Sequence, residues 1–129
     1  MIKGVGIDII EIDRIEQALK KNPRFIDRIF TEEEISFLKG NRKPMASYAG
    51  YFAAKEAVSK ALGTGFRGFS WRDIEIQKDD LNRPFVSLHN KAKEQLGIIG
   101  GTEVWISISH SKKDAVAQAV ISKGGSYDE

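Results

Sequence analysis

The segment YFAAKEAVSKALGTG, residues 51–65, contains one glutamate and two lysines, and the spacing of Glu56 and Lys60 could support chemistry. On a helix, residues four positions apart lie on the same face. One interpretation is a solvated ion pair, which stabilises a helix by about 0.3–0.5 kcal/mol. The alternative is a magnesium site. It requires a second carboxylate close in space, because magnesium is usually held by one or two carboxylates together with water and phosphate oxygens.

Asp8 is the candidate for that second carboxylate. It lies in the apolar sequence GIDII, where an acid is costly unless a cation, a hydrogen bond or solvent meets it. The alternative for Asp8 is a structural role, either capping the following helix or pairing with Arg14. His110, in SISHS, is a candidate base or phosphate contact, and an equally simple role is a strand-end histidine hydrogen-bonded to the backbone.

These side chains need elements that bring them together. The β-branched opening segment predicts a strand at about 2–9, with Asp8 near its end. Thr31 followed by Glu34 has the form of a capping box, which predicts a helix from about 32. Helices are expected early and strands late, which is typical of an α+β fold with a small antiparallel sheet. The predicted helices are about 12–21, 24–29, 32–39, 45–62 and 90–97, and the later strands about 71–80, 85–89, 102–111 and 115–122.

The composition limits the class of protein. A chain of 129 residues has the length of one globular domain, which we expect to cover 1–122 and to be followed by a flexible tail at 123–129. The absence of cysteine excludes disulfides and thiolate metal sites. A net charge of +2 gives no argument for nucleic acid. Because neither a signal peptide nor a membrane span is recognisable, we expect a cytoplasmic protein.

Two further features concern partners. Residues 14–28, RIEQALKKNPRFIDR, carry five Lys and Arg side chains against one Glu and one Asp, which predicts a local basic surface. In addition, so short a chain leaves little room for a deep internal pocket, which favours a site between subunits.

Three motifs occur in order along the chain: GVGIDIIEIDRI at 4–15, GYFAAKEAVSKALGTGF at 50–66 and VWISISHSKKDAVAQAVI at 104–121. In this order and spacing they resemble the holo-acyl-carrier-protein synthase family, the short bacterial type of phosphopantetheinyl transferase. The resemblance implies the fold of that family and Mg2+-dependent transfer of 4'-phosphopantetheine from coenzyme A to a serine of apo acyl carrier protein, supporting fatty acid biosynthesis. It also implies a homotrimer with active sites between subunits.

Carried over by position, the resemblance implies that Asp8 and Glu56 are catalytic residues and Mg2+ ligands, and that Lys60 contacts the phosphates of coenzyme A. The general base is left open between a metal-bound water and one of the two carboxylates. The other implied contacts with coenzyme A are Arg42, Lys43 and His110, and His110 is expected to serve the site of a neighbouring subunit. The implied docking surface for the acidic carrier protein comprises Arg14, Lys21, Arg24, Phe25, Ile26 and Arg28.

Tyr51 departs from the family pattern, in which this position is often an arginine. A tyrosine can donate one hydrogen bond but supplies no positive charge. The resemblance therefore leaves open how this chain meets the nucleotide phosphate that the arginine would contact.

Two other functions compete with carrier-protein modification. A Mg2+-dependent phosphohydrolase would use water as the acceptor, and it would have no need of a basic docking surface. A non-catalytic oligomeric module that binds an acidic protein would need only the basic segment 14–28. That module would leave Asp8, Glu56 and Lys60 without a role.

Overall fold

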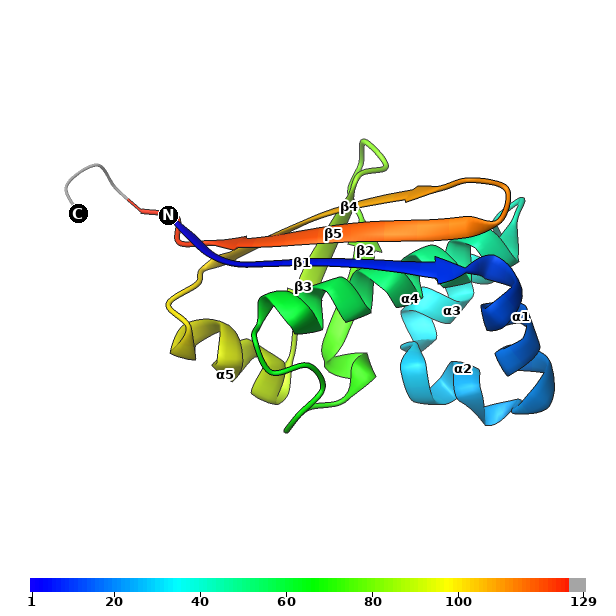
Figure 1. Cartoon of the computed structure of the whole chain (residues 1–129), viewed down its shortest axis with the longest axis horizontal. Helices are drawn as coiled ribbons and strands as arrows, with labels where there is room; N and C mark the ends of the chain where they lie inside the picture. The colour runs from blue at the N-terminus through cyan, green and yellow to red at the C-terminus, as the bar shows by residue number, and fades with distance from the viewer. Residues whose placement is uncertain (126–129) are drawn as a thin grey trace.

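The computed structural model describes residues 1–125 and confirms the α+β class (Figure 1). Strands β1, β5 and β4 form an antiparallel three-stranded sheet in that order, and β2 pairs with β3 in a separate hairpin. The elements in chain order are β1 (Ile2–Glu11), α1 (Ile12–Lys21), α2 (Arg24–Ile29), α3 (Glu32–Lys39), α4 (Pro44–Ala61), η1 (Trp71–Asp73, a 3-10 turn), β2 (Ile74–Lys78), β3 (Pro84–Leu88), α5 (Asn90–Ile98), β4 (Glu103–His110) and β5 (Asp114–Ser122).

The long helix α4 runs along one face of the three-stranded sheet (Figure 1). Helices α1, α2 and α3 gather at one end of the molecule, and α5 lies at the other. Among the first four helices, α4 is therefore the one that covers the sheet. The others pack around α4, η1 and β2.

Most predicted boundaries lie within a residue or two of the observed ones. The largest difference within the first half is at β1, which continues from the predicted end at residue 9 to Glu11, because Ile10 and Glu11 still pair with Ala115 and Asp114 of β5. Residues 123–125, the first part of the predicted tail, are exposed and form neither helix nor strand, and residues 126–129 lie outside the described part of the chain.

The interface between α4 and the sheet is built from very small residues. A Cβ atom on Gly6 would overlap the carbonyl oxygen of Ala57, and one on Gly4 would overlap that of Ala61. Across the same interface, β5 contributes three buried alanines at positions 115, 117 and 119. Because the side chains are this small, the helix backbone approaches the strand closely and brings the second half of α4 beside Asp8.

The opposite face of the sheet is apolar and open to solvent. Val5, Ile7 and Ile9 alternate with the inward residues of β1 and are 63%, 63% and 66% exposed, and Trp105 of β4 is 58% exposed. Soluble monomers rarely expose contiguous apolar patches of this kind, and such patches mark interaction sites. This face is therefore a candidate interface between subunits.

Candidate active site

Asp8 and Lys60 form an ion pair across the interface between β1 and α4. The Lys60 ammonium donates to Asp8 Oδ1 at 3.1 Å and to the carbonyl oxygen of Ile7 at 2.9 Å. The side chain of Lys60 is 50% exposed, whereas that of Asp8 is 17% exposed. The pair thus lies at the edge of the sheet, where a ligand from solvent can reach the ammonium.

Glu56 completes this group from the preceding turn of α4. Its side chain is half-buried, and burial raises the pKa of the Glu56 carboxyl, with a further increase from the nearby Asp8 charge and an opposing effect of Lys60. Lys60 pairs with Asp8, and no salt bridge in the described chain joins it to Glu56. Read from α4 alone, the Glu56–Lys60 spacing suggested a local surface pair, but the lysine's partner comes from β1.

The donor set suits Mg2+. Two carboxylates lie close enough to repel each other, so a cation between them would relieve that repulsion. Within residues 1–125, no group of three or more His, Cys, Asp and Glu side chains is placed to hold a metal ion. Two protein carboxylates with water and phosphate oxygens in the remaining positions are the arrangement that Mg2+ commonly takes in phosphoryl-transfer sites.

One cleft brings together the residues that the resemblance assigns to the nucleotide. Arg42, Lys43 and His110 line a cleft of about 430 Å³ with Asn41 and Ser47. His110 ends β4, is exposed, and makes a 3.2 Å contact from Nδ1 to the carbonyl oxygen of Ser111. Along α4, however, residue 43 precedes residue 56 by a rise of about 20 Å, at 1.5 Å per residue. Within one chain, Lys43 is therefore well separated from Glu56, while Asp8, Glu56 and Lys60 lie together at the edge of the sheet.

Tyr51 lies between Phe37 and the interior. Its ring stacks on that of Phe37, with centroids 6.2 Å apart and planes 8° apart, and it is 4% exposed. Burial raises the pKa of the Tyr51 hydroxyl, and Glu34 raises it further, so the side chain stays neutral. Tyr51 also lines a cavity of about 400 Å³ that includes His110 and Lys78. Lys78 thus contributes a basic side chain to the cavity that Tyr51 lines.

The residues expected to dock the carrier protein fall into an exposed basic group and a half-buried apolar group. The four basic side chains, Arg14 and Lys21 of α1 and Arg24 and Arg28 of α2, are all exposed. Phe25 and Ile26 are half-buried and pack against the core, and the ring of Phe25 lies 6.1 Å from that of Phe52. The charged part of the proposed surface is therefore open, and its apolar part is shared with the fold.

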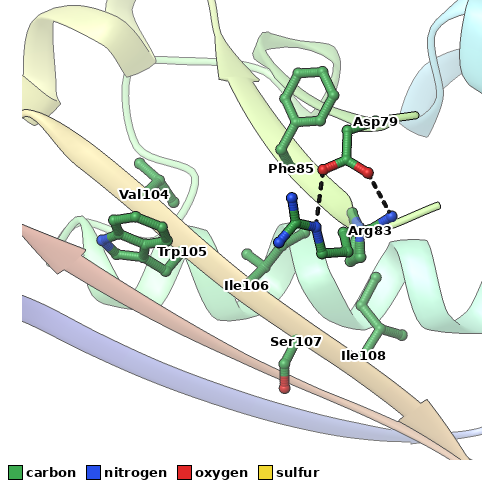
Figure 2. Close-up of a pocket in the computed structure, with 9 residues that line it drawn as sticks. Asp79, Arg83, Phe85, Val104, Trp105, Ile106, Ser107 and Ile108 are labelled. Atoms are coloured by element: carbon green, nitrogen blue, oxygen red, sulfur yellow. Dashed lines mark hydrogen bonds and ion pairs between the residues drawn. The ribbon is translucent and has the colours of Figure 1, made fainter. Parts of the chain in front are cut away.

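Another groove, of about 490 Å³, lies between β4 and the tip of the β2–β3 hairpin (Figure 2). The hairpin side includes Asp79 and Arg83, which form an ion pair at 3.1 Å, and the β4 side includes the exposed Trp105. Asp79 accepts hydrogen bonds from the amides of Arg83 and Leu81, and these lower the pKa of its carboxyl. Asp79 therefore has a structural role in the turn.

One buried ion pair was not recognised from the sequence. Lys55, the residue before Glu56, pairs with Glu34 of α3 at 2.8 Å, and neither side chain has any exposed surface. The capping box predicted at Thr31 and Glu34 is confirmed, with Glu34 Oε1 accepting from the Thr31 amide at 2.8 Å. The capping box explains the contact of Glu34 with the Thr31 amide. No pattern along the chain indicates that Glu34 also pairs with Lys55.

Comparison with known proteins defines the class of this fold and site. The family model of the 4'-phosphopantetheinyl transferase superfamily matches residues 4–118. The chain therefore belongs to the 4'-phosphopantetheinyl transferase superfamily.

Within that superfamily, the chain is similar to several holo-[acyl-carrier-protein] synthases. The chain is 56% identical over 120 residues to the holo-[acyl-carrier-protein] synthase of Alkaliphilus oremlandii, covering 93% of this chain and 98% of that protein. It superposes on the holo-[acyl-carrier-protein] synthase of Neisseria meningitidis with a TM-score of 0.88 at 38% identity, covering 95% and 100% of the two chains. The enzyme of Helicobacter pylori, solved in complex with coenzyme A, gives a TM-score of 0.81 at 38% identity, covering 92% and 99%. The family resemblance of the three motifs is confirmed.

Proposed function

We propose that this protein transfers the 4'-phosphopantetheine group from coenzyme A to a serine of apo acyl carrier protein. The serine hydroxyl gives up its proton to a general base, its oxygen forms a bond to the β-phosphorus, and the bond from that phosphorus to the adenosine 3',5'-bisphosphate leaving group breaks. The observation that carries the proposal is the grouping of Asp8, Glu56 and Lys60 at the edge of the sheet in a chain of this superfamily. The complex of the related Helicobacter pylori enzyme with coenzyme A supports the donor.

Asp8 and Glu56 are the residues that would hold Mg2+. When bound, the ion would neutralise negative charge on the pyrophosphate of coenzyme A as it is displaced. Lys60 would act as a second positive group on the same phosphates. Its half exposure supports this role, because the ammonium can turn from Asp8 Oδ1 to a ligand oxygen that enters from solvent, and the bound cation would then compensate the Asp8 charge.

The protein acts as a homotrimer, and a neighbouring subunit completes each site. Lys43 lies about 20 Å along α4 from Glu56, at a rise of 1.5 Å per residue, so it cannot readily reach the same pyrophosphate in one chain, and Arg42 and His110 line the same cleft as Lys43. The exposed apolar face formed by Val5, Ile7 and Ile9 offers the surface through which copies would associate. Light scattering tests the assembly: the wild type should have three times the chain mass, and Ile7→Lys should be monomeric. A wild-type monomer would contradict the trimer.

The acidic carrier protein docks on the basic surface of α1 and α2. Exposed charges mainly accelerate and orient association. Arg24→Glu should therefore raise the KM for carrier protein at least about fivefold and leave the KM for coenzyme A unchanged. Lys93→Glu, the same charge reversal at an exposed position of α5, is the matched control and should change neither. Equal effects of the two variants would refute this docking surface.

The reaction itself is tested by mass spectrometry of apo acyl carrier protein incubated with the protein, coenzyme A and Mg2+. The carrier should gain one phosphopantetheine, and Glu56→Gln should abolish the gain while the protein remains folded. Release of free phosphopantetheine with an unmodified carrier would favour a phosphohydrolase. Binding of the carrier without any chemistry under any divalent metal would favour a non-catalytic module.

None of the helices in residues 1–125 is long and apolar enough to cross a membrane. We place the reaction in the cytoplasm. The absence of cysteine from the sequence is compatible with a reducing compartment.

A further inference from the structure

The ion pair of Lys55 and Glu34 is fully enclosed in the protein. The Lys55 ammonium donates to Glu34 Oε1 at 2.8 Å, to the carbonyl oxygen of Ile74 at 2.6 Å and to that of Trp71 at 3.1 Å. An ammonium has three N–H donors, so these acceptors use all of them. Lys55 therefore has no donor left for a ligand, in contrast to Lys60, and it does not act on substrate directly.

Glu34 is equally well satisfied and joins three elements. Its Oε1 accepts from the amide of Thr31 at 2.8 Å, and its Oε2 accepts from the amide of Ile76 at 2.7 Å. Through Lys55 the carboxylate is also bound to α4. The pair thus ties α4 to the N-terminus of α3 and to strand β2, at a point where both side chains are shielded from water.

The position of this joint on α4 matters because Lys55 directly precedes Glu56. Successive side chains on an α-helix point about 100° apart. With Lys55 held toward Ile74 of β2, Glu56 is directed around the helix toward Asp8 of β1. A rotation of α4 that broke the three hydrogen bonds of Lys55 would also swing the Glu56 carboxylate away from Asp8.

The interface between α4 and the sheet is poorly suited to prevent such a rotation, so α4 depends on contacts on its other side, such as the stacking of Phe52 on Trp71 and the Glu34–Lys55 pair. The helix face toward the sheet is formed by Ala53, Ala57 and Ala61, and β1 opposes it with Gly4 and Gly6. These small residues permit close approach but offer few side chains that interlock. In some proteins, buried ion or polar pairs contribute specificity of arrangement rather than net stability. The Glu34–Lys55 pair is the feature of α4 best placed to define its rotation.

We propose that Lys55 and Glu34 are positioning residues, which set the rotation of α4 about its axis so that Glu56 faces Asp8 across a shared cation. The inference rests on the proposed function, since it concerns the same carboxylate pair. It predicts that breaking the buried pair weakens metal binding although neither residue touches the metal or the substrate.

The test compares four proteins at 10 °C, where unfolding is suppressed: the wild type, Lys55→Met, Glu34→Gln and Ile121→Ala. Met keeps the length of the lysine stem, and Gln keeps an acceptor for the amides of Thr31 or Ile76. Ile121→Ala is the control, because Ile121 is fully buried in β5 and its truncation lowers the thermal midpoint without touching the pair. Two readouts are taken: Mn2+ affinity in the presence of coenzyme A, from the EPR signal of the free ion, and the Mg2+ concentration that gives half-maximal transfer.

In both readouts Lys55→Met should require about 10- to 100-fold more metal than the wild type, the range found when groups that orient metal ligands are removed. Glu34→Gln should shift in the same direction, and it carries the test alone if Lys55→Met does not fold. Ile121→Ala should shift the thermal midpoint and leave both metal readouts unchanged.

Unchanged metal readouts in both pair variants, or an equal shift in Ile121→Ala, would overturn the positioning role and leave the proposed function intact. A wild type that binds no metal with coenzyme A and leaves apo carrier protein unmodified would instead overturn the proposed function, and the inference with it. The two failures are therefore distinguishable.

Discussion

Two lysines five residues apart on α4 occupy opposite environments. Lys55 is completely buried, with its carboxylate partner and two backbone carbonyls consuming all three donors. Lys60 is 50% exposed and contacts Asp8 at 3.1 Å, a longer distance than the 2.8 Å of the buried pair. Both are lysine–carboxylate pairs that link α4 to another element. They differ in whether a ligand can enter.

This difference separates structure from function within one helix. Burial lowers the pKa of Lys55, and the Glu34 charge opposes that effect, so the ammonium depends on its partner to stay charged inside the protein. A buried pair of this kind is costly to break and costly to rearrange. The Asp8–Lys60 pair should be the weaker of the two, because its lysine is half exposed and water screens the attraction. A weak pair can be exchanged for phosphate and metal, which a binding site requires.

The largest expected effect follows from breaking the buried pair. Lys55→Met leaves the Glu34 carboxylate buried without its cation, and this should lower the free energy of unfolding by about 3–5 kcal/mol. Adding Glu34→Gln removes that uncompensated charge and should restore at least about 1 kcal/mol. Urea unfolding at pH 7 measures both values. A loss below about 1 kcal/mol in the single variant would show that the pair does not behave as an isolated buried ion pair.

The next largest effect tests the close approach of α4 to β1, on which the placement of both lysines depends. In Gly6→Ala the new methyl group would meet the backbone of Ala57, which cannot rotate away, so α4 must shift from β1 at a cost of about 3 kcal/mol. The shift should also weaken transfer, because it separates Glu56 from Asp8. Gly97→Ala in α5 is the matched control. It meets no atom within 4 Å and should stabilise the helix by up to about 1 kcal/mol. Thermal unfolding and the transfer assay together check the pair of variants.

The sequence pattern was sufficient for most of the fold because the signals are local. Thr31 and Glu34 sit at the spacing of a capping box, and Asn22 and Pro23 end α1. The alanines of β5 look helical by propensity, but their alternation with Val116 and Val120 is that of a strand whose buried face must be small. In this case the period of the pattern was a better guide than the propensity of the residues.

The site was only partly accessible from sequence, because its contacts join distant segments. The spacing of Glu56 and Lys60 suggested a local pair, and nothing in that spacing indicates that Lys60 reaches Asp8, 52 residues away. The buried pair was missed for the same reason, since Glu34 and Lys55 lie on different helices and each has an unremarkable neighbourhood. A charged residue surrounded by Ala53, Ala54 and Ala57 is the only local sign that Lys55 is buried.

A smaller effect on stability, with a large one on activity, is expected at the exposed pair. Lys60→Met should change the free energy of unfolding by less than about 1 kcal/mol, because the lysine is half exposed and its partner keeps contact with water. Transfer should nevertheless fall at least about tenfold in kcat/KM, since the variant lacks a charge that acts on phosphate. Lys93→Met, at an exposed position of α5 away from the basic surface, should change neither quantity and serves as the control. A parallel loss of stability and activity would remove the distinction between the two lysines.

The smallest effect concerns the acid that lies between them in sequence. Burial and the charge of Asp8 raise the pKa of Glu56, so the folded protein binds this proton more tightly than the unfolded chain does. Glu56 therefore favours the fold most below its ordinary pKa, and this contribution is lost as the pH rises through its folded-state pKa.

In metal-free protein, Glu56→Gln should accordingly raise the thermal midpoint slightly at pH 7, and the gain should shrink toward zero near pH 4. Glu94→Gln on the exposed face of α5 should show no such gain. A lower midpoint for Glu56→Gln at pH 7 would mean that Lys60 stabilises the Glu56 carboxylate more than Asp8 and burial oppose it. The more stable variant should also be the inactive one, because Glu56 is kept charged in an unfavourable place for the sake of a cation.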